Sequence, residues 1–178
     1  MKHMQTYIAL IRGINVGGHK QVKMAELKTK CESLGLRDVR TLLQSGNVVF
    51  RTSGGDRAKL AKKIEAVLGV DAKVILRTAE ELRSAVAKNP MVREAESDPS
   101  HFIVTFLAAR PAATAMTELR DAYNGPETMQ LHGAELYIHY GRGVGTSKLT
   151  NTLIERKLGV AGTARNWNTV TKLAALAE

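Results

Sequence analysis

The stretch "VRTLLQSGNVVFR", residues 39–51, is typical of a β-hairpin and anchors the interpretation of the first half of the chain. Two β-prone runs flank Ser45 and Gly46, which stand at the expected tip. Side chains alternate between the two faces of a strand, so this register defines one shared face. The residues that we predict on that face are Val39, Thr41, Leu43, Val48 and Phe50.

The segments around this hairpin predict helices and further strands. Residues 5–11 form a short apolar, β-prone run, and apolar residues then recur at helical spacing up to a stop at Gly35. After the hairpin, Asp56 can cap a helix that ends at Gly69, and residues 72–78 form the next strand. Thr78 and Glu81 have the spacing of a capping box for a short helix. The order is that of one ferredoxin-like unit.

The second half repeats the same order of elements. A strand is expected at 102–108, a helix after Pro111, a hairpin over 127–140 with Gly133 at its tip, and a helix ending at Gly159. The sequence leaves open whether a last strand forms at 162–168, before a C-terminal helix. We therefore predict an α+β fold of two ferredoxin-like (βαββαβ) halves packed into one compact unit. The expected boundaries are 1–89, a linker at 90–101, and 102–178.

Composition and charge narrow the classes of function. Cys31 is the only cysteine, so there is no intrachain disulfide, and its helical apolar neighbours indicate a buried side chain. No apolar run approaches the ~20 residues of a membrane span, and we predict a cytoplasmic protein. The net charge of +9 is uneven: residues 1–90 carry 17 Lys or Arg against 8 Asp or Glu. Such a field attracts polyanions, acidic proteins or phosphorylated ligands, although many basic domains bind none of these.

The glycine-rich stretch "YGRGVGTSKL", residues 140–149, is the first candidate ligand site. It does not match the Walker A pattern, because Thr146 stands where the second glycine is required. It does not match the dinucleotide fingerprint either, because Gly141, Gly143 and Gly145 are evenly spaced. It does run from a strand into a helix start, where backbone N–H groups favour an anion. The alternative is a hinge loop in which Ser147 or Thr150 caps the helix. The candidate ligand-binding residues are Arg142, Gly143, Gly145, Ser147 and Lys148.

Two further segments share this character. The loop "RGINVGGHKQVK", residues 12–23, also joins a strand to a helix, and the hairpin tip is expected at the same end of the sheet. Its candidates, with those of the tip, are Arg12, Asn15, Gly17, Gly18, Lys20, Lys23, Gln44, Ser45 and Asn47. The third segment, residues 162–170, contributes Arg165, Asn166, Trp167 and Asn168. There Trp167 is either a stacking platform or a core anchor, and Asn166 is most simply an N-cap.

Other chemistries have little support in the sequence. The histidines show no zinc-ligand spacing, no Gly-x-Ser-x-Gly elbow occurs, and no carboxylate pair stands near the three loops. His19 is a weakly supported catalytic candidate. We therefore assign no catalytic residue, cofactor or metal, and leave open whether the protein is an enzyme.

Four stretches together resemble a known family. They are "LIRGINVGGHKQVKMAEL", "LQSGNVVF", "GVGTSKL" and "TARNWNTVTKL", and the resemblance runs from residue 5 to about residue 173. The chain is similar to the bacterial domain of unknown function 1697 family. The resemblance implies a two-part α+β fold with ferredoxin-like features and implies no reaction, substrate or cofactor.

Three functions remain open at this point. We favour a module that binds a phosphate-bearing small ligand, such as a nucleotide, through the basic loops. The alternatives are an enzyme acting on a phosphorylated substrate and a nucleic-acid-binding protein, the latter disfavoured because the strands carry few aromatics to stack bases. A purely structural or partner-binding role is the remaining alternative. The sequence does not determine the oligomeric state.

Overall fold

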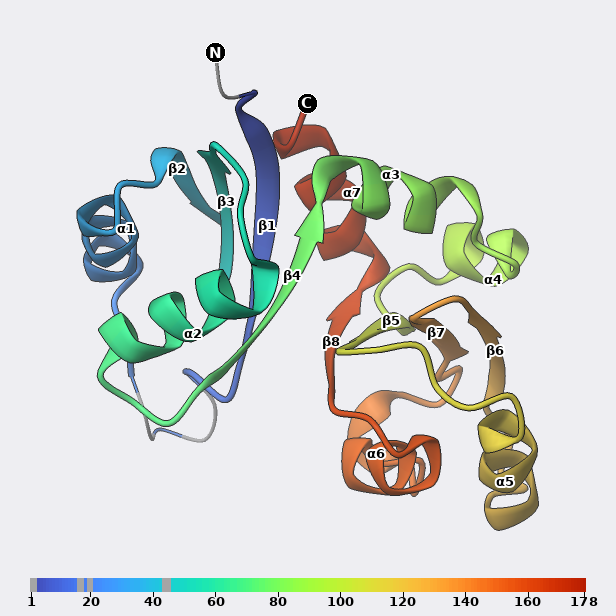
Figure 1. The fold of residues 1–178 in the computed structure, drawn as a ribbon. Helices are drawn as coiled ribbons and strands as arrows, with labels where there is room; N and C mark the ends of the chain where they lie inside the picture. The colour runs from blue at the N-terminus through green and yellow to red at the C-terminus, as the bar shows by residue number, and fades with distance from the viewer. Residues whose placement is uncertain (1–2, 16–17, 19–20, 43–45) are drawn as a thin grey trace. The chain divides into compact units, whose positions relative to one another are not determined.

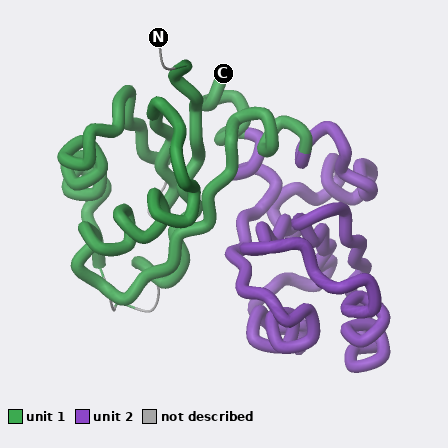
Figure 2. The backbone as a smooth tube through the Cα atoms, in the orientation of Figure 1, with its two compact units in different colours: residues 1–84, 172–178 green, residues 85–171 purple. Residues whose placement is uncertain are grey.

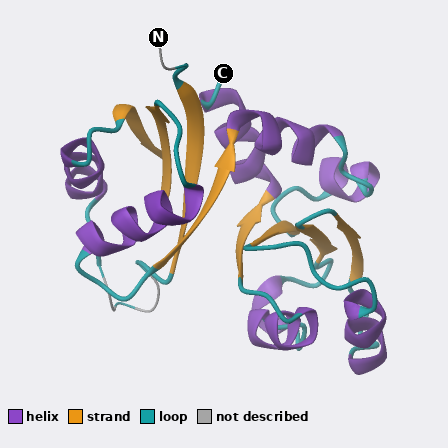
Figure 3. Ribbon diagram, viewed as in Figure 1, coloured by secondary structure: helices purple, strands orange, loops and turns teal. Residues whose placement is uncertain are grey.

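The chain is described by a computed structural model that covers residues 3–15, 18, 21–42 and 46–178. It has an α+β fold with two four-stranded antiparallel sheets. Spatial contacts between residues divide the chain into two compact units. They are residues 1–84 with 172–178 (unit 1) and residues 85–171 (unit 2), which Figure 2 shows in different colours. Each unit combines one sheet with helices, as Figure 3 shows.

Unit 1 has the topology of a ferredoxin-like unit. Its strands are β1 (Gln5–Arg12), β2 (Arg37–Leu42), β3 (Asn47–Thr52) and β4 (Lys73–Thr78), in the spatial order β2-β3-β1-β4. Helices α1 (Met24–Ser33) and α2 (Arg57–Leu68) follow β1 and β3 in the chain and cover one face of the sheet (Figure 1). The βαββαβ order that the sequence predicts is confirmed.

The hairpin of β2 and β3 has the predicted facing. Thr41 pairs with Val48 and Arg40 with Val49. Val39, Val48 and Phe50 enter one apolar core, together with buried residues of α1 and α2 such as Cys31 and Ile64. Leu43 and Ser45 lie outside the described residues. Because side chains alternate between the two faces of a strand, these three apolar residues of the hairpin all face the helices.

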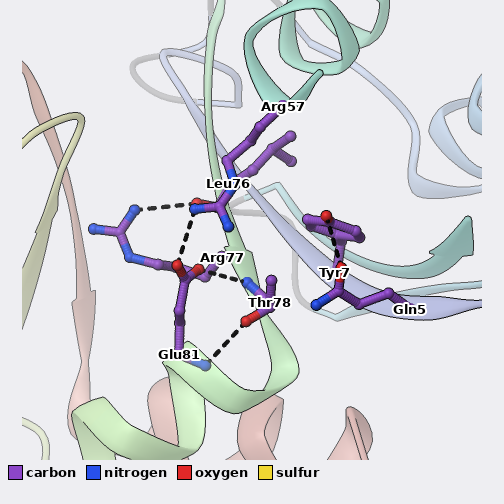
Figure 4. Close-up of polar contacts among 7 residues, drawn as sticks. All are labelled: Gln5, Tyr7, Arg57, Leu76, Arg77, Thr78 and Glu81. Carbon is purple, nitrogen blue, oxygen red and sulfur yellow. Dashed lines mark hydrogen bonds and ion pairs between the residues drawn. The ribbon is translucent and has the colours of Figure 1, made fainter. Parts of the chain in front are cut away.

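The helix ends of unit 1 follow local chemistry. The Asp56 side chain accepts a hydrogen bond from the Lys59 N–H at 3.1 Å, and Gly69 ends α2 in the left-handed region at φ 70°. Thr78 and Glu81 form the predicted capping box of α3 (Ala79–Ala87), with reciprocal bonds of 2.8 and 3.1 Å (Figure 4). These signals identify the helix starts without reference to tertiary contacts.

Unit 2 repeats the topology. Its strands are β5 (Phe102–Leu107), β6 (Thr128–His132), β7 (Glu135–His139) and β8 (Gly162–Asn166), in the order β6-β7-β5-β8. Helices α5 (Ala115–Ala122) and α6 (Asn151–Leu158) pack on one face, with Leu119, Leu136 and Ile154 in their shared core. The last strand, which the sequence leaves open, does form: β8 pairs with β5 along five residues.

The segment expected to link the two halves contains a helix. Residues 92–97 form α4 (Val92–Ser97), and the division between units falls between Ser84 and Ala85. The C-terminal helix α7 (Trp167–Leu176) begins in unit 2, and residues 172–178 belong to unit 1. In the described part of the chain, no helix has both the length and the apolar character required to cross a bilayer.

Candidate functional site

A cavity of about 700 Å³ in unit 2 lies between the turn after α5 and the glycine-rich loop after β7. Thr128, at the start of β6, pairs with His139 at the end of β7, so these two connections lie at the same end of the sheet. The polar side chains that line the cavity are Tyr123, Asn124, Glu127, Arg142, Thr146, Ser147 and Lys148. The site therefore unites a predicted loop with a segment that the sequence did not indicate.

Hydrogen bonds hold both ends of the glycine-rich loop. The buried Tyr140 donates its hydroxyl proton to the Leu149 carbonyl oxygen at 3.0 Å, which joins the residues on either side of the loop. Gly143 turns the chain at φ 89°, a value that favours glycine. At the far end the Thr150 side chain caps α6 by accepting the Leu153 N–H at 3.2 Å. The loop thus starts and ends at fixed points of unit 2.

Glu127 connects the two segments that form the cavity. Its carboxylate accepts a hydrogen bond from the Ser147 hydroxyl at 2.5 Å and another from the Tyr123 hydroxyl. Burial raises the pKa of Glu127, but these hydrogen bonds and the positive charge of Arg142 together hold that pKa below its usual value. Glu127 is therefore an ionised acceptor at neutral pH.

Arg142 and Lys148 supply positive charge around this carboxylate. Both side chains line the cavity and both residues are exposed. Neither forms an ion pair within 4 Å with any residue that the structure describes. With Glu127 the cavity carries two cations and one anion. A negatively charged ligand group would gain attraction there without breaking an existing pair.

Ser147 lines the cavity and does not cap α6. Its hydroxyl donates to Glu127 and accepts the Leu149 N–H at 3.0 Å. The N-cap of α6 is Thr150, so of the two hinge-loop alternatives the structure selects Thr150 as the cap. Ser147 is thus a link between the two cavity segments.

In unit 1, the described candidates of the first loop make local contacts. The Asn15 amide joins both backbone groups of Val22, donating to its carbonyl at 3.0 Å and accepting its N–H at 2.8 Å. The buried Asn47 donates to the Leu42 carbonyl at 2.8 Å and so closes the hairpin. The Ile11 N–H donates to the Gly46 carbonyl at 2.8 Å, which confirms that the loop and the hairpin tip share one end of the sheet.

The other candidate residues at this end of the unit 1 sheet are described only in part. A hollow of about 420 Å³ is lined by Asn15, Gly18 and Lys23 among others, and Lys23 is exposed at the N-cap position of α1. Arg12 is the last residue of β1. The candidates Gly17, Lys20, Gln44 and Ser45, and the catalytic candidate His19, lie outside the described residues.

The third segment forms part of the core and caps α7. Arg165 is buried and lies opposite Val104 in the pairing of β8 with β5. Its guanidinium donates to the Thr163 hydroxyl and to the Ala164 carbonyl, each at 2.8 Å. Burial lowers the pKa of Arg165 to about 10. The Asn166 side chain accepts the Thr169 N–H at 2.9 Å and caps α7. Neither residue lines the unit 2 cavity.

The aromatic candidate Trp167 packs edge-to-face on Phe102, with ring centroids 5.6 Å apart. Trp167 is half-buried, and this contact with the buried Phe102 favours the core-anchor alternative over the stacking platform. Asn168 is exposed and does not line the cavity. Among the described residues, no group of three or more His, Cys, Asp or Glu side chains is arranged to hold a metal ion.

The sequence did not identify Tyr123 and Glu127 as site residues. Glu127 stands 20 residues before Ser147, in a locally acidic region, and no spacing rule relates the two. The signal that could have found them is the topology itself. In a ferredoxin-like unit the connections before the second strand and after the third strand lie at one end of the sheet.

Comparisons with known proteins show the family and the fold. The family model described as protein of unknown function (DUF1697) matches residues 4–137. The solved structure of SP0830, a conserved bacterial protein from Streptococcus pneumoniae, is similar at a TM-score of 0.76 and 21% sequence identity, covering 99% of this chain and 100% of that one. None of the curated proteins matches the chain significantly.

Proposed function

The chain belongs to the DUF1697 family of proteins of unknown function, and from its geometry we propose that the unit 2 cavity binds a phosphate-bearing small ligand. The observation that carries this proposal is the pair of exposed cations, Arg142 and Lys148, on a loop held at both ends. A phosphate group between them would form charge-assisted hydrogen bonds.

The size of the cavity and the anchoring of its loop support the proposal. A volume of about 700 Å³ falls within the 300–1,000 Å³ that is typical of small-ligand sites. Because Tyr140 and Thr150 hold the loop ends, less ordering of the backbone is required when a ligand binds. Arg142 can present its planar fork to two phosphate oxygens, and Lys148 can act as a mobile point charge.

Glu127 restricts the kind of ligand. Its ionised carboxylate repels a second anionic group and accepts hydrogen bonds from hydroxyl or amino groups. A ligand that carries a phosphate at one end and such donors at the other, as a nucleotide or sugar phosphate does, satisfies both parts of the cavity. Inorganic phosphate alone satisfies only the cations.

Binding explains the geometry better than nucleophilic catalysis. The Ser147 hydroxyl, which could serve as a nucleophile, donates a hydrogen bond to the Glu127 carboxylate at 2.5 Å. The pKa of Glu127 is held below its usual value, and a carboxylate of low pKa is a weak general base. The same contact instead joins the two segments that line the cavity.

The test is ligand-induced stabilisation of the full chain. Thermal unfolding is measured with nucleotides, sugar phosphates and inorganic phosphate, each at low and high salt. A ligand at a hundred times its Kd adds about 2.7 kcal/mol to the stability of the folded state. We expect this response from one phosphorylated class and a much smaller one from inorganic phosphate.

Two double variants test whether the ligand-induced stabilisation arises from binding at the cavity. Arg142→Ala with Lys148→Ala should remove it, whereas Arg156→Ala with Lys157→Ala removes equal charge from α6 and should preserve it. Both altered residues of the control lie outside the cavity lining. If the two double variants respond alike, the ligand does not bind where we place it.

A further inference from the structure

The positive charge of the chain is concentrated in unit 1. The residues of unit 1 include 17 Lys or Arg against 9 Asp or Glu, a net charge of +8. Unit 2 has 9 against 8, a net charge of +1. The cavity described above therefore lies in the nearly neutral unit, and the excess positive charge lies in the other unit.

Helix α2 displays part of this excess in uncompensated form. Lys59, Lys62 and Lys63 are exposed on α2, and none forms an ion pair with a described residue. Glu65 is the sole acidic residue of the helix, and its carboxylate accepts the Val74 N–H at 2.8 Å. Among the described residues, no carboxylate on α2 thus forms an ion pair with these three lysines.

Helix α1 provides an internal comparison. There Lys30 pairs with Glu26 at 2.9 Å and Lys28 with Glu32 at 3.9 Å, each four residues apart. This is the arrangement that stabilises an exposed helix. In α2 the corresponding spacing joins two like charges, Lys59 and Lys63, which destabilises the helix slightly.

The helix dipole makes the placement less favourable still. Lys59 lies in the first turn, where the partial positive charge of the helix N-terminus favours acidic residues, and α2 has none there. Asp56 at the N-cap offsets part of this repulsion. Helix stability therefore does not account for the three lysines, whereas an anionic partner would relieve their mutual repulsion.

We propose that the exposed face of α2, defined by Lys59, Lys62 and Lys63, binds the phosphate backbone of a double-stranded nucleic acid. Four residues of helix rise about 6 Å along the axis, so the three lysines lie within about one turn of the same helix. Such contacts neutralise phosphates and read no bases, so binding is independent of sequence.

The surface composition distinguishes a duplex from other anionic partners. Val92 and Val144 are the exposed large apolar residues of the described chain, and neither lies on α2. An interfacial membrane helix needs an apolar face to insert, which the exposed side of α2 lacks. Binding of single strands relies on aromatic platforms for the bases, and no described aromatic side chain is strongly exposed.

The test is the salt dependence of duplex binding by the full chain. Fluorescence anisotropy with a labelled 20-base-pair duplex compares the wild type with a variant carrying Lys59→Gln, Lys62→Gln and Lys63→Gln. Each lost contact lowers the log–log salt slope by about 0.9, so the triple variant should lose about 2.7. Between 50 and 200 mM salt the wild-type affinity should then fall about 40-fold more than that of the variant.

A charge-matched control carries Lys28→Gln, Lys30→Gln and Lys88→Gln, and its slope should stay close to the wild-type value. The thermal midpoint of the α2 variant should not fall, because its lysines make no ion pairs with described residues. Equal slopes for the two triple variants would overturn the proposal in favour of net charge alone. Tighter binding to anionic vesicles or to single strands than to the duplex would overturn it as well.

Discussion

Gly46 offers a sharp test of how the first loop contacts the hairpin in unit 1. It lies at φ 80°, and its carbonyl accepts the Ile11 N–H. A Cβ added there would lie 2.7 Å from Ile14 Cδ1 and 3.0 Å from Ile11 Cβ. Both isoleucines are buried at 1% exposure, so neither can move aside freely. Gly46→Ala should therefore be destabilising through both the backbone and the packing.

The two contributions can be separated with a second glycine. Gly35 has nearly the same backbone angle, φ 79°, but a Cβ there meets nothing within 4 Å. Gly35→Ala should cost only the left-handed backbone penalty of about 1–2 kcal/mol. Gly46→Ala adds overpacking of about 1–3 kcal/mol, for a total of about 2–5 kcal/mol. The difference between the variants measures the contact between the loop and the hairpin.

The assay is urea unfolding of each variant followed by circular dichroism. Because the chain has two compact units, hydrogen exchange of the β1 and β3 amides is needed to assign the loss to unit 1. We expect the largest decrease in protection in Gly46→Ala. If Gly46→Ala costs no more than Gly35→Ala, the close approach of the hairpin tip to Ile14 is refuted.

Three further predictions concern other parts of the chain. Hydrogen bonds with His139, and to a smaller extent with His101, lower the pKa of Asp98. Because the pKa of Asp98 is lower in the folded than in the unfolded chain, its ionised carboxylate stabilises the folded state at neutral pH. That contribution to stability is lost as the pH falls below about 4. Asp98→Asn should flatten the fall of the urea midpoint between pH 7 and pH 3. Burial raises the pKa of Cys31 to about 11. A thiol reagent at pH 8 should therefore label Cys31 only when the protein unfolds. The stability of the folded state should fall from pH 9 to pH 11, because the thiol ionises in the unfolded chain but not yet in the folded one. Tyr137→Phe removes a buried bond to the Ala85 carbonyl at 2.6 Å and should cost about 1–3 kcal/mol in urea unfolding; no measurable loss would contradict that bond.

Much of the fold could be predicted because its signals are local. Alternation of period two identified the hairpin face that carries Val48 and Phe50, and helical spacing identified the face that carries Cys31. The helix starts at Asp56 and Thr78 follow from side chains that bond to backbone N–H groups three residues away. These interactions lie within a few residues of each other, so sequence spacing determines them.

The candidate site depended on contacts between distant residues. Glycine, basic and amide residues at a strand-to-helix loop are equally typical of a ligand site and of a tight turn. Asn15, Asn47 and Asn166 bond to nearby backbone groups, and Trp167 packs on Phe102. The loop around Arg142 instead meets Glu127 from another connection. The sequence by itself determined which helices and strands form, because the interactions that specify them are short in range. Only the tertiary structure decided which loops line a cavity, because chain topology brings connections that are distant in sequence to one end of a sheet.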